Sequence, residues 1–403
     1  MLGWRLPLLG LAAISMSISQ ALPAWALQRA LPACPFGLPE DFGAIPQPQD
    51  PTSEEGSDEQ DEPSPGIALP NSSGCLFLSQ EVISGSELKS VRTRNTGGDP
   101  GALNVLSSTS QLGATFGLTH VDGRLEDPLV TALSIRAGPD GQASLNQVSI
   151  GNSRFTAGMD SSRFDSWGGD EFSFRSLAPA QSPAQAAAVL GKGERWIALV
   201  SLEDPSFRRV TVSGYGGSNQ PDLVARWAGQ LGPATLVLAG ASHQTTLADN
   251  SRFQGYAGIA SLKYDLEALG NGSYVLVQGT VAHKALGYLG INTTSNALSL
   301  NLPGVLSAAV AEQGRGLSGA AVAVWEVSDR WRLAAYSTAA RLNVPILSGG
   351  DLTSWRSAAN VKWSPAKGFD FILEGGLGRT LSGISIIPSS TTKSMVMTVS
   401  KSL

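Results

Sequence analysis

Residues 355–363 read Trp-Arg-Ser-Ala-Ala-Asn-Val-Lys-Trp and indicate the fold more clearly than any other stretch of the chain. Apolar residues alternate there with polar ones, and side chains two residues apart point to the same face of a β-strand. Trp355 and Trp363 therefore share the apolar face. Eight residues at about 3.3 Å each place them roughly 26 Å apart. This is close to the ~25 Å height of the apolar band on a strand that crosses an outer membrane.

The same pattern recurs elsewhere in the chain, with Tyr256 and Tyr264 at the ends of an alternating segment and a further one at 112–119. Short turn signals occur at 231–233, 267–272, 328–329 and 364–368, whereas longer polar or Gly-rich stretches occur at 214–221, 286–296 and 383–392. Alternating short and long connections are typical of membrane barrels. Because every backbone group must be paired in lipid, the strands must close on themselves. The sequence predicts an all-β protein, a closed antiparallel transmembrane β-barrel of about 16 strands over residues 67–403.

The first 26 residues have the pattern of a signal peptide. Arg5 precedes an apolar run at 8–18, and Ala24-Trp25-Ala26 offers small residues at a cleavage site. The alternative is a membrane-spanning helix, but the run is shorter than the ~20 residues that a helix needs. We expect export to the outer membrane of a Gram-negative bacterium, where the barrel would contact outer-membrane lipid.

Residues 27–66 form an acidic segment rich in Pro and Gln, which we expect to be a disordered leader. It could be a solvated tether or a specific binding segment. The chain has 33 acidic and 28 basic residues, but the leader carries much of the negative charge, so the rest is nearly neutral. A nucleic-acid partner is therefore not expected. Cys34 and Cys75 are predicted to form a disulfide, since export permits one; a reactive or metal-binding thiol is the alternative.

One segment has helix signals. Ser182 to Gly191 carries Ser, Pro and Gly at the expected capping positions around an Ala-rich run. We therefore expect a short helix there, within a long connection over 167–194. Long connections of this kind are often functional.

Several sequence islands resemble the general porins of alphaproteobacteria, in the order in which that family has them. They are 74–76 (GCL), 154–165 (RFTAGMDSSRFD), 200–209 (VSLEDPSFRR), 220–244 (QPDLVARWAGQLGPATLVLAGASHQ), 255–265, 282–290 and 361–374 (VKWSPAKGFDFILE). The resemblance implies a homotrimer of 16-stranded barrels for passive diffusion of small hydrophilic solutes and ions, inserted by the barrel-assembly machinery. The long spacing between the cysteines and the non-aromatic last residue, Leu403, depart from the family pattern.

The resemblance also implies that the third long loop folds into the lumen and narrows it. Its place falls in the 167–194 connection, where the expected constriction residues are Asp170, Glu171 and Arg175. Strand parity predicts which residues face the lumen and form the pore wall: Arg136, Arg154, Asp160, Arg195, Arg226, Lys263, Arg332, Arg356 and Lys362. The same parity directs Phe155, Ala157, Met159, Trp196, Ala198, Val200, Phe369, Phe371 and Leu373 outward. An acidic loop facing a basic wall would set a transverse field across the pore.

Motifs that could indicate other chemistry lack the necessary context. Residues 314–319 match GxGxxG, but no helix follows, so we expect a loop and no cofactor. His120, His243 and His283 lack metal-ligand spacing, so no metal site is predicted, and each is expected in a girdle or loop. No local nucleophile motif supports an enzyme. The alternatives to a porin are a structural or envelope-tethering barrel without an open pore and, with less support, a barrel enzyme.

Overall fold

The structure is a computed structural model of the whole chain. It describes residues 67–68, 74–94, 101–120, 129–137, 143–166, 183–209, 215–217, 220–270, 272–290, 313–344, 350–383 and 389–402. The predicted signal peptide and leader, and Cys34 with them, lie outside these ranges.

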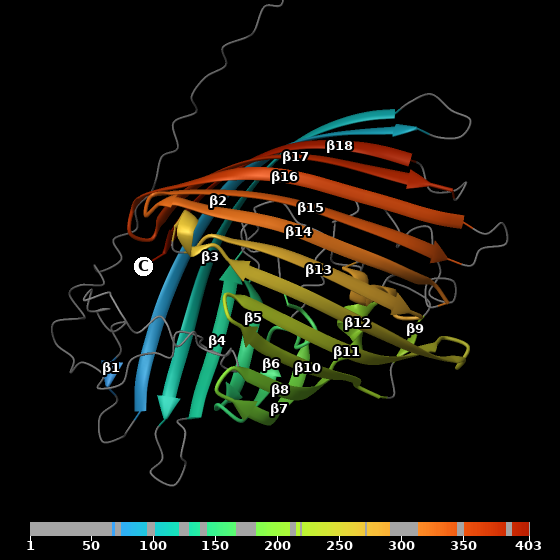
Figure 1. Cartoon of the computed structure of the whole chain (residues 1–403), viewed down its shortest axis with the longest axis horizontal. Coiled ribbons are helices and arrows are strands. Elements are labelled where there is room, and N and C mark those ends of the chain that lie inside the picture. Colours follow the sequence, from blue (N-terminus) through green and yellow to red (C-terminus); the bar gives the residue numbers. More distant parts are fainter. Residues whose placement is uncertain are drawn as a thin grey trace, which may run out of the picture.

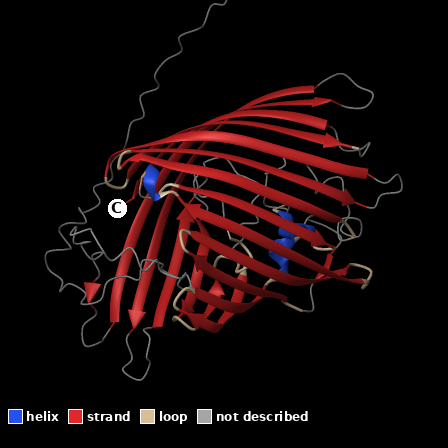
Figure 2. Cartoon of the chain, viewed as in Figure 1, coloured by secondary structure: helices blue, strands red, loops and turns tan. Residues whose placement is uncertain are grey.

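Sixteen antiparallel strands form a closed ring, as the alternating pattern predicts (Figures 1 and 2). The ring consists of β2 (Gly74–Arg94), β3 (Gly101–His120), β4 (Leu129–Ala137), β5 (Ala143–Gly151), β6 (Phe155–Met159), β7 (Ala184–Gly193), β8 (Trp196–Glu203), β10 (Asp222–Leu231), β11 (Ala234–Leu247), β12 (Arg252–Asp265), β13 (Tyr274–His283), β14 (Arg315–Ser328), β15 (Trp331–Val344), β16 (Gly350–Ala366), β17 (Phe369–Ser382) and β18 (Ser389–Ser402). Two short strands, β1 (Ile67–Ala68) and β9 (Tyr215–Gly217), pair beside it. Strand β18 pairs with β2 and closes the ring.

The connections differ between the two ends of the barrel. At one end they are short, such as 194–195, 232–233, 329–330 and 367–368. At the other end lie 160–183, 204–221 and 284–314, and this end also carries the 3₁₀ turns η1 (Pro205–Arg208) and η3 (Leu286–Leu289). A third 3₁₀ turn, η2 (Glu267–Leu269), lies at the short-turn end. Because β2 starts and β18 finishes at the short-turn end, both ends of the barrel sequence emerge there.

Strand parity separates the two faces. On β16 Arg356 and Asn360 are buried on the lumen side, while Trp355 and Trp363 lie on the outer face with the alternate residues. Trp363 stacks on Trp331 and on Phe371, with ring centroids 5.9 and 5.4 Å apart. These outward rings form part of an aromatic girdle at the short-turn end. The buried apolar clusters lie on the lumen side of the wall.

Two local expectations are wrong. The predicted helix at 182–191 is strand β7, which pairs with β6 and β8. In a wall that needs every backbone group paired with a neighbour, ladder bonds outweigh the helix propensity of alanine. The 314–319 segment is the start of β14 and not a loop, because residues 315–319 pair with both β13 and β15.

Within the described residues no helix is long and apolar enough to cross a membrane.

Candidate pore constriction

The connection between β6 and β7, residues 160–183, is the third on the long-loop side and is the loop expected to narrow the lumen. Its first part, 160–166, is described and turns inward from the wall. The proposed constriction residues Asp170, Glu171 and Arg175 lie outside the described residues. The expected bounds of this connection, 167–194, are wrong, since its second half is β7.

The predicted wall residues fall into three groups. Those on lumen-facing strand positions are Arg226, Lys263, Arg332, Arg356 and Lys362. Arg154 and Arg195 stand instead in the exposed turns β5–β6 and β7–β8 at the short-turn end, because β6 begins at Phe155 and β8 at Trp196. Asp160 begins the third loop. Arg136 lies in β4, but its side chain is not among those described.

The inward wall residues near the short-turn end are paired with acids. Lys263 lies 2.9 Å from Asp265, Arg332 lies 3.0 Å from Glu326, and Lys362 lies 2.9 Å from Asp370. The positive charge of this part of the wall is therefore largely compensated locally.

A short ion pair shapes the first turn of the third loop. Arg163 donates to Asp160 at 2.8 Å, and Gln147 on β5 donates to the same carboxylate at 3.3 Å. Both charged side chains are almost fully buried. Burial raises the pKa of Asp160, while the charge of Arg163 opposes that shift. The pair holds this turn against the wall.

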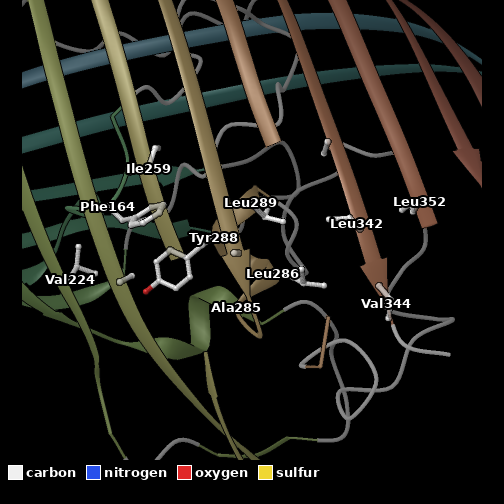
Figure 3. Close-up of a cluster of buried hydrophobic side chains, with 13 residues drawn as sticks. Phe164, Val224, Ile259, Ala285, Leu286, Tyr288, Leu289, Leu342, Val344 and Leu352 are labelled. Carbon is white, nitrogen blue, oxygen red and sulfur yellow. The ribbon is translucent and has the colours of Figure 1, made fainter. Parts of the chain in front are cut away.

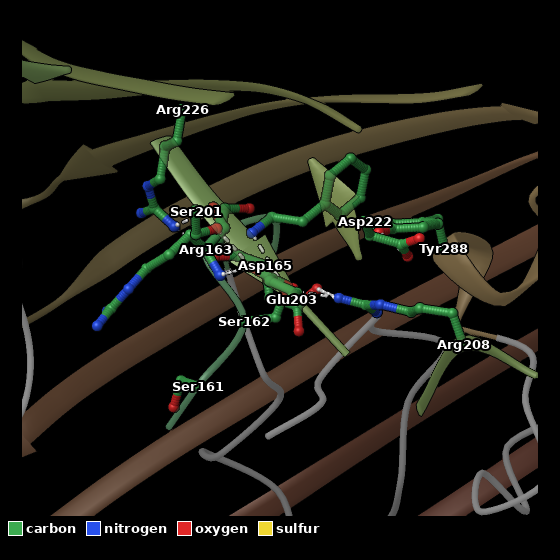
Figure 4. Close-up of polar contacts among 12 residues, drawn as sticks. Ser161, Ser162, Arg163, Asp165, Ser201, Glu203, Arg208, Asp222, Arg226 and Tyr288 are labelled. Carbon is green, nitrogen blue, oxygen red and sulfur yellow. Dashed lines mark hydrogen bonds and ion pairs between the residues drawn. The ribbon is translucent and has the colours of Figure 1, made fainter. Parts of the chain in front are cut away.

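Glu203, the last residue of β8, ties the loop to its neighbouring strand (Figure 4). It accepts hydrogen bonds from the Ser162 hydroxyl at 2.6 Å, the Arg163 backbone N–H at 2.8 Å and the Ser201 hydroxyl at 2.8 Å. Its side chain is 2% exposed. A buried carboxylate with three donors fixes the position of the loop backbone.

Arg208 in η1 reaches the same loop from the other side. Its guanidinium donates to the Ser162 hydroxyl at 2.6 Å and lies 3.3 Å from Asp165. It also stacks over the ring of Tyr288, 4.4 Å from the centroid. Burial by itself lowers the pKa of Arg208, but the charges of Asp165, Glu203 and Asp222 raise it overall, so the group stays a cation.

Tyr288 in η3 continues the network to β10 and β11. Its hydroxyl donates to Asp222 at 2.6 Å, and Asp222 also contacts the His243 ring nitrogen Nδ1 at 2.8 Å. Thr245 contacts the other ring nitrogen at 2.8 Å. Burial and the charge of Asp222 raise the pKa of Tyr288 well above its ordinary value, so the phenol keeps its proton. The sequence suggested that His243 lies in a girdle or a loop. It is instead buried on the lumen side of β11, where it pairs with Asp222.

An apolar cluster surrounds these polar groups (Figure 3). Phe164 packs edge-on against Tyr288 with centroids 4.7 Å apart, and both are fully buried. Leu286 and Leu289 of η3 lie in the same cluster as Leu342 on β15. The exclusion of water strengthens the neighbouring hydrogen bonds.

The loop then extends over the lumen towards other strands. Arg226 on β10 donates to the backbone carbonyls of Arg163, at 3.4 Å, and of Asp165. The Ser166 hydroxyl contacts Gln278 of β13. The described part of the loop therefore makes contacts from β5 to β13 and forms a fixed ledge inside the barrel.

Most members of this network were not singled out from the sequence. No motif and no regular spacing in the sequence marks Glu203, Arg208, Asp222 and Tyr288 as members of one site. They do lie in three of the porin-like islands, 200–209, 220–244 and 282–290, and these meet a fourth island, 154–165, in this one place. That shared resemblance was the signal that could have found them.

Comparisons with known proteins address the fold. No family model matches the chain, and no curated protein sequence does. The outer membrane channel DcaP of Acinetobacter baumannii superposes with a TM-score of 0.65 at 13% identity, covering 84% of this chain and 99% of DcaP. The chain therefore has the fold of outer-membrane porins.

Two further structures agree with it. The anion-selective porin from Comamonas acidovorans gives a TM-score of 0.51 at 12% identity, covering 81% of this chain and all of that porin. Salmonella typhi OmpF, solved with daunomycin, gives 0.51 at 10% identity, covering 84% of this chain and all of OmpF. The architecture is that of a multi-pass β-barrel of the Gram-negative outer membrane.

Neither the predicted disulfide nor a metal site is found in the described part of the chain. Cys75 lies in β2, but its side chain is not among those described, and Cys34 falls outside the described residues, so the predicted pairing is not confirmed. No group of acidic, His or Cys side chains among the described residues could hold a metal ion.

Proposed function

We propose that the chain is a porin, a water-filled channel through which small hydrophilic solutes and ions diffuse passively across the outer membrane. The observation that carries this proposal is the ledge formed by residues 160–166. Buried charged side chains hold this loop inside the barrel, and a fixed loop in that position narrows the lumen permanently. The porin fold supports it. The resemblance of the islands extends the proposal to membership of the alphaproteobacterial general porins and to insertion by the barrel-assembly machinery.

The direct test is conductance of the purified full chain in a planar lipid bilayer under a salt gradient. A channel should give discrete current steps, and the reversal potential should report which ion sign it prefers. If protein with intact β-sheet circular dichroism inserts into the bilayer and conducts no ions, the porin proposal is wrong.

A barrel without an open pore is the second candidate, and one observation favours it. Two clusters of buried apolar side chains face the lumen, one around Ile197 and Leu199 and the other around Leu276, Val322 and Tyr336. An aqueous channel usually presents polar residues to its interior. Conductance separates the two candidates, because a closed structural barrel gives no current steps.

We also propose that the loop beyond the ledge sets the charge preference. Asp170 and Glu171 would face Arg226 across the narrowest point, where confinement leaves charges less screened than on an open surface. Asp170→Asn combined with Glu171→Gln should then shift selectivity towards anions. The matched control is Asp329→Asn with Glu267→Gln in the short turns, and its reversal potential should equal that of the unchanged chain. An equal reversal potential in both double variants would place the two acids outside the constriction.

The proposal includes a homotrimer and the absence of enzymatic activity. Cross-linking in mild detergent should give a three-chain product, and monomers alone would contradict that part. The refolded protein should hydrolyse neither a lipid nor a peptide reporter above the rate of buffer.

A further inference from the structure

A groove of about 690 Å³ lies on the outer face of the barrel at the long-loop end, across strands β12 to β16. It belongs to none of the lumen contacts described above. Tyr256, Val281 and Leu317 line it with side chains that are more than half exposed, and strand parity directs all three away from the lumen. An outer-membrane barrel presents such a surface to lipid.

Charged residues line the part of the groove nearest the long-loop end of the barrel. Arg315 is the first residue of β14 and stands opposite His283, the last residue of β13, and Asn343 on β15. Arg341 stands opposite Leu317, two residues nearer the middle of the barrel. Arg315 and Arg341 are therefore diagonal neighbours on the outer face.

The depth of these charged residues in the membrane follows from their distance to the aromatic residue Trp355 on the outer face of β16. Asp351 lies four residues beyond Trp355 along β16, about 13 Å towards the long-loop end. Since aromatic girdles mark the boundary of the apolar band, Arg315, Arg341 and Asp351 stand at the level of lipid headgroups. Val281 and Leu317 stand opposite each other and beside Arg341, two residues nearer the middle of the barrel than Arg315 and Asp351.

The charge of the groove is unbalanced. Arg341 pairs with Asp351, and Asn343 donates to the same carboxylate at 2.8 Å. Arg315 adds a second guanidinium beside this pair. Guanidinium groups bind phosphate oxygens with two parallel hydrogen bonds, so two of them at diagonal positions match a phosphate monoester or diester.

We propose that this groove binds an anionic lipid of the outer leaflet, with its phosphate between Arg315 and Arg341 and an acyl chain along Leu317 and Val281. The site is independent of the lumen, and the inference rests on the membrane placement of the barrel and not on an open pore. The bound lipid would anchor β13 to β16 at one level of the membrane.

Native mass spectrometry of the full chain, released from detergent micelles containing phosphatidylglycerol, tests the proposal. We expect one lipid to stay bound to the unchanged chain, with phosphatidylcholine retained at least tenfold less well. Arg315→Gln combined with Arg341→Gln should weaken phosphatidylglycerol binding about tenfold or more, as expected for the loss of two charge-assisted contacts. The control, Arg330→Gln with Lys367→Gln in the short turns, removes the same charge and should leave binding unchanged.

Asp351→Asn gives a second test of the same site in case the double arginine variant does not fold. It removes the carboxylate that competes for Arg341, so phosphatidylglycerol should bind several-fold tighter. Equal binding of both lipids, equal loss in the short-turn control, or weaker binding in Asp351→Asn would overturn the proposal. Competition by inorganic phosphate at the same concentration would identify a simple anion site and also overturn it. None of these outcomes depends on conductance, so the lipid site and the channel can fail separately.

Discussion

Glu203 is the residue on which the third loop depends most directly. Its carboxylate receives three donors in a site closed to water. Glu203→Gln replaces one acceptor oxygen by an NH₂ group, so at least one donor loses its partner. We expect a loss of about 1–3 kcal/mol in the free energy that holds the loop down. Limited proteolysis should then cut within 160–183 faster than in the unchanged chain.

Glu326→Gln is the control for that prediction. Glu326 is a partly exposed carboxylate whose partner, Arg332, lies at the short-turn end. Partly exposed pairs contribute about 0–1 kcal/mol, so this variant should leave proteolysis of 160–183 unchanged. Equal cleavage in the two variants would mean that Glu203 does not hold the loop.

Gly287 lies where η3 passes the backbone of η1, and a Cβ at this position would overlap the carbonyl oxygen of Arg208. Gly287→Ala should therefore push η3 away from Arg208 and weaken the stack of Arg208 on Tyr288. Overpacking of this kind costs about 1–3 kcal/mol, which a urea titration followed by tryptophan fluorescence should detect. Gly279→Ala on the outer face of β13, where nothing lies within 4 Å of the added Cβ, should shift the midpoint little. A midpoint shift no larger than that of Gly279→Ala would contradict the proposed contact.

Among the elements, β7 offers the sharpest test, because its sequence favours a helix and its neighbours make it a strand. Ala188 lies mid-strand on the outer face. Ala188→Arg should therefore cost about 2–4 kcal/mol of insertion free energy, as for a basic residue facing the middle of a bilayer. Ala188→Leu should be neutral or stabilising. Folding into lipid vesicles at graded urea concentrations measures both, and equal tolerance of Arg and Leu would place residue 188 away from lipid.

The sequence predicted the elements whose pattern is local. In β12 and β16 the alternation of apolar and polar residues and the spacing of the aromatic residues lie within one continuous segment. The strands, their outward faces and the turns beside them can therefore be predicted from the sequence. In β7 the decisive contacts come from β6 and β8, and alanine supplies no period-two signal. The η1 and η3 turns and their network were missed for a related reason. Asp222 and Tyr288 meet only because the barrel brings β10 and the end of β13 together.

At the scale of the whole molecule, the ring assigns every connection to one end of the barrel. Connections 345–349 and 383–388 lie at the long-loop end, whereas 232–233 lies at the short-turn end with both ends of the barrel sequence. A short epitope inserted at 345–349 should be stained by antibody on intact cells. The same epitope at 232–233 should be stained only after the outer membrane is permeabilised. The opposite staining would invert the orientation used for the lipid groove.

The seam between β18 and β2 joins the last strand of the ring to the first, whereas every other wall pair joins strands that follow closely in the chain. Pairings between distant segments form slowly, because the chain loses its freedom before the contact forms. Until β18 arrives, β2 presents an open edge that could recruit another chain. Residues 389–402 therefore govern the time for which the unfinished barrel is prone to aggregate. A weakened seam would lengthen that interval even where the completed barrel is stable.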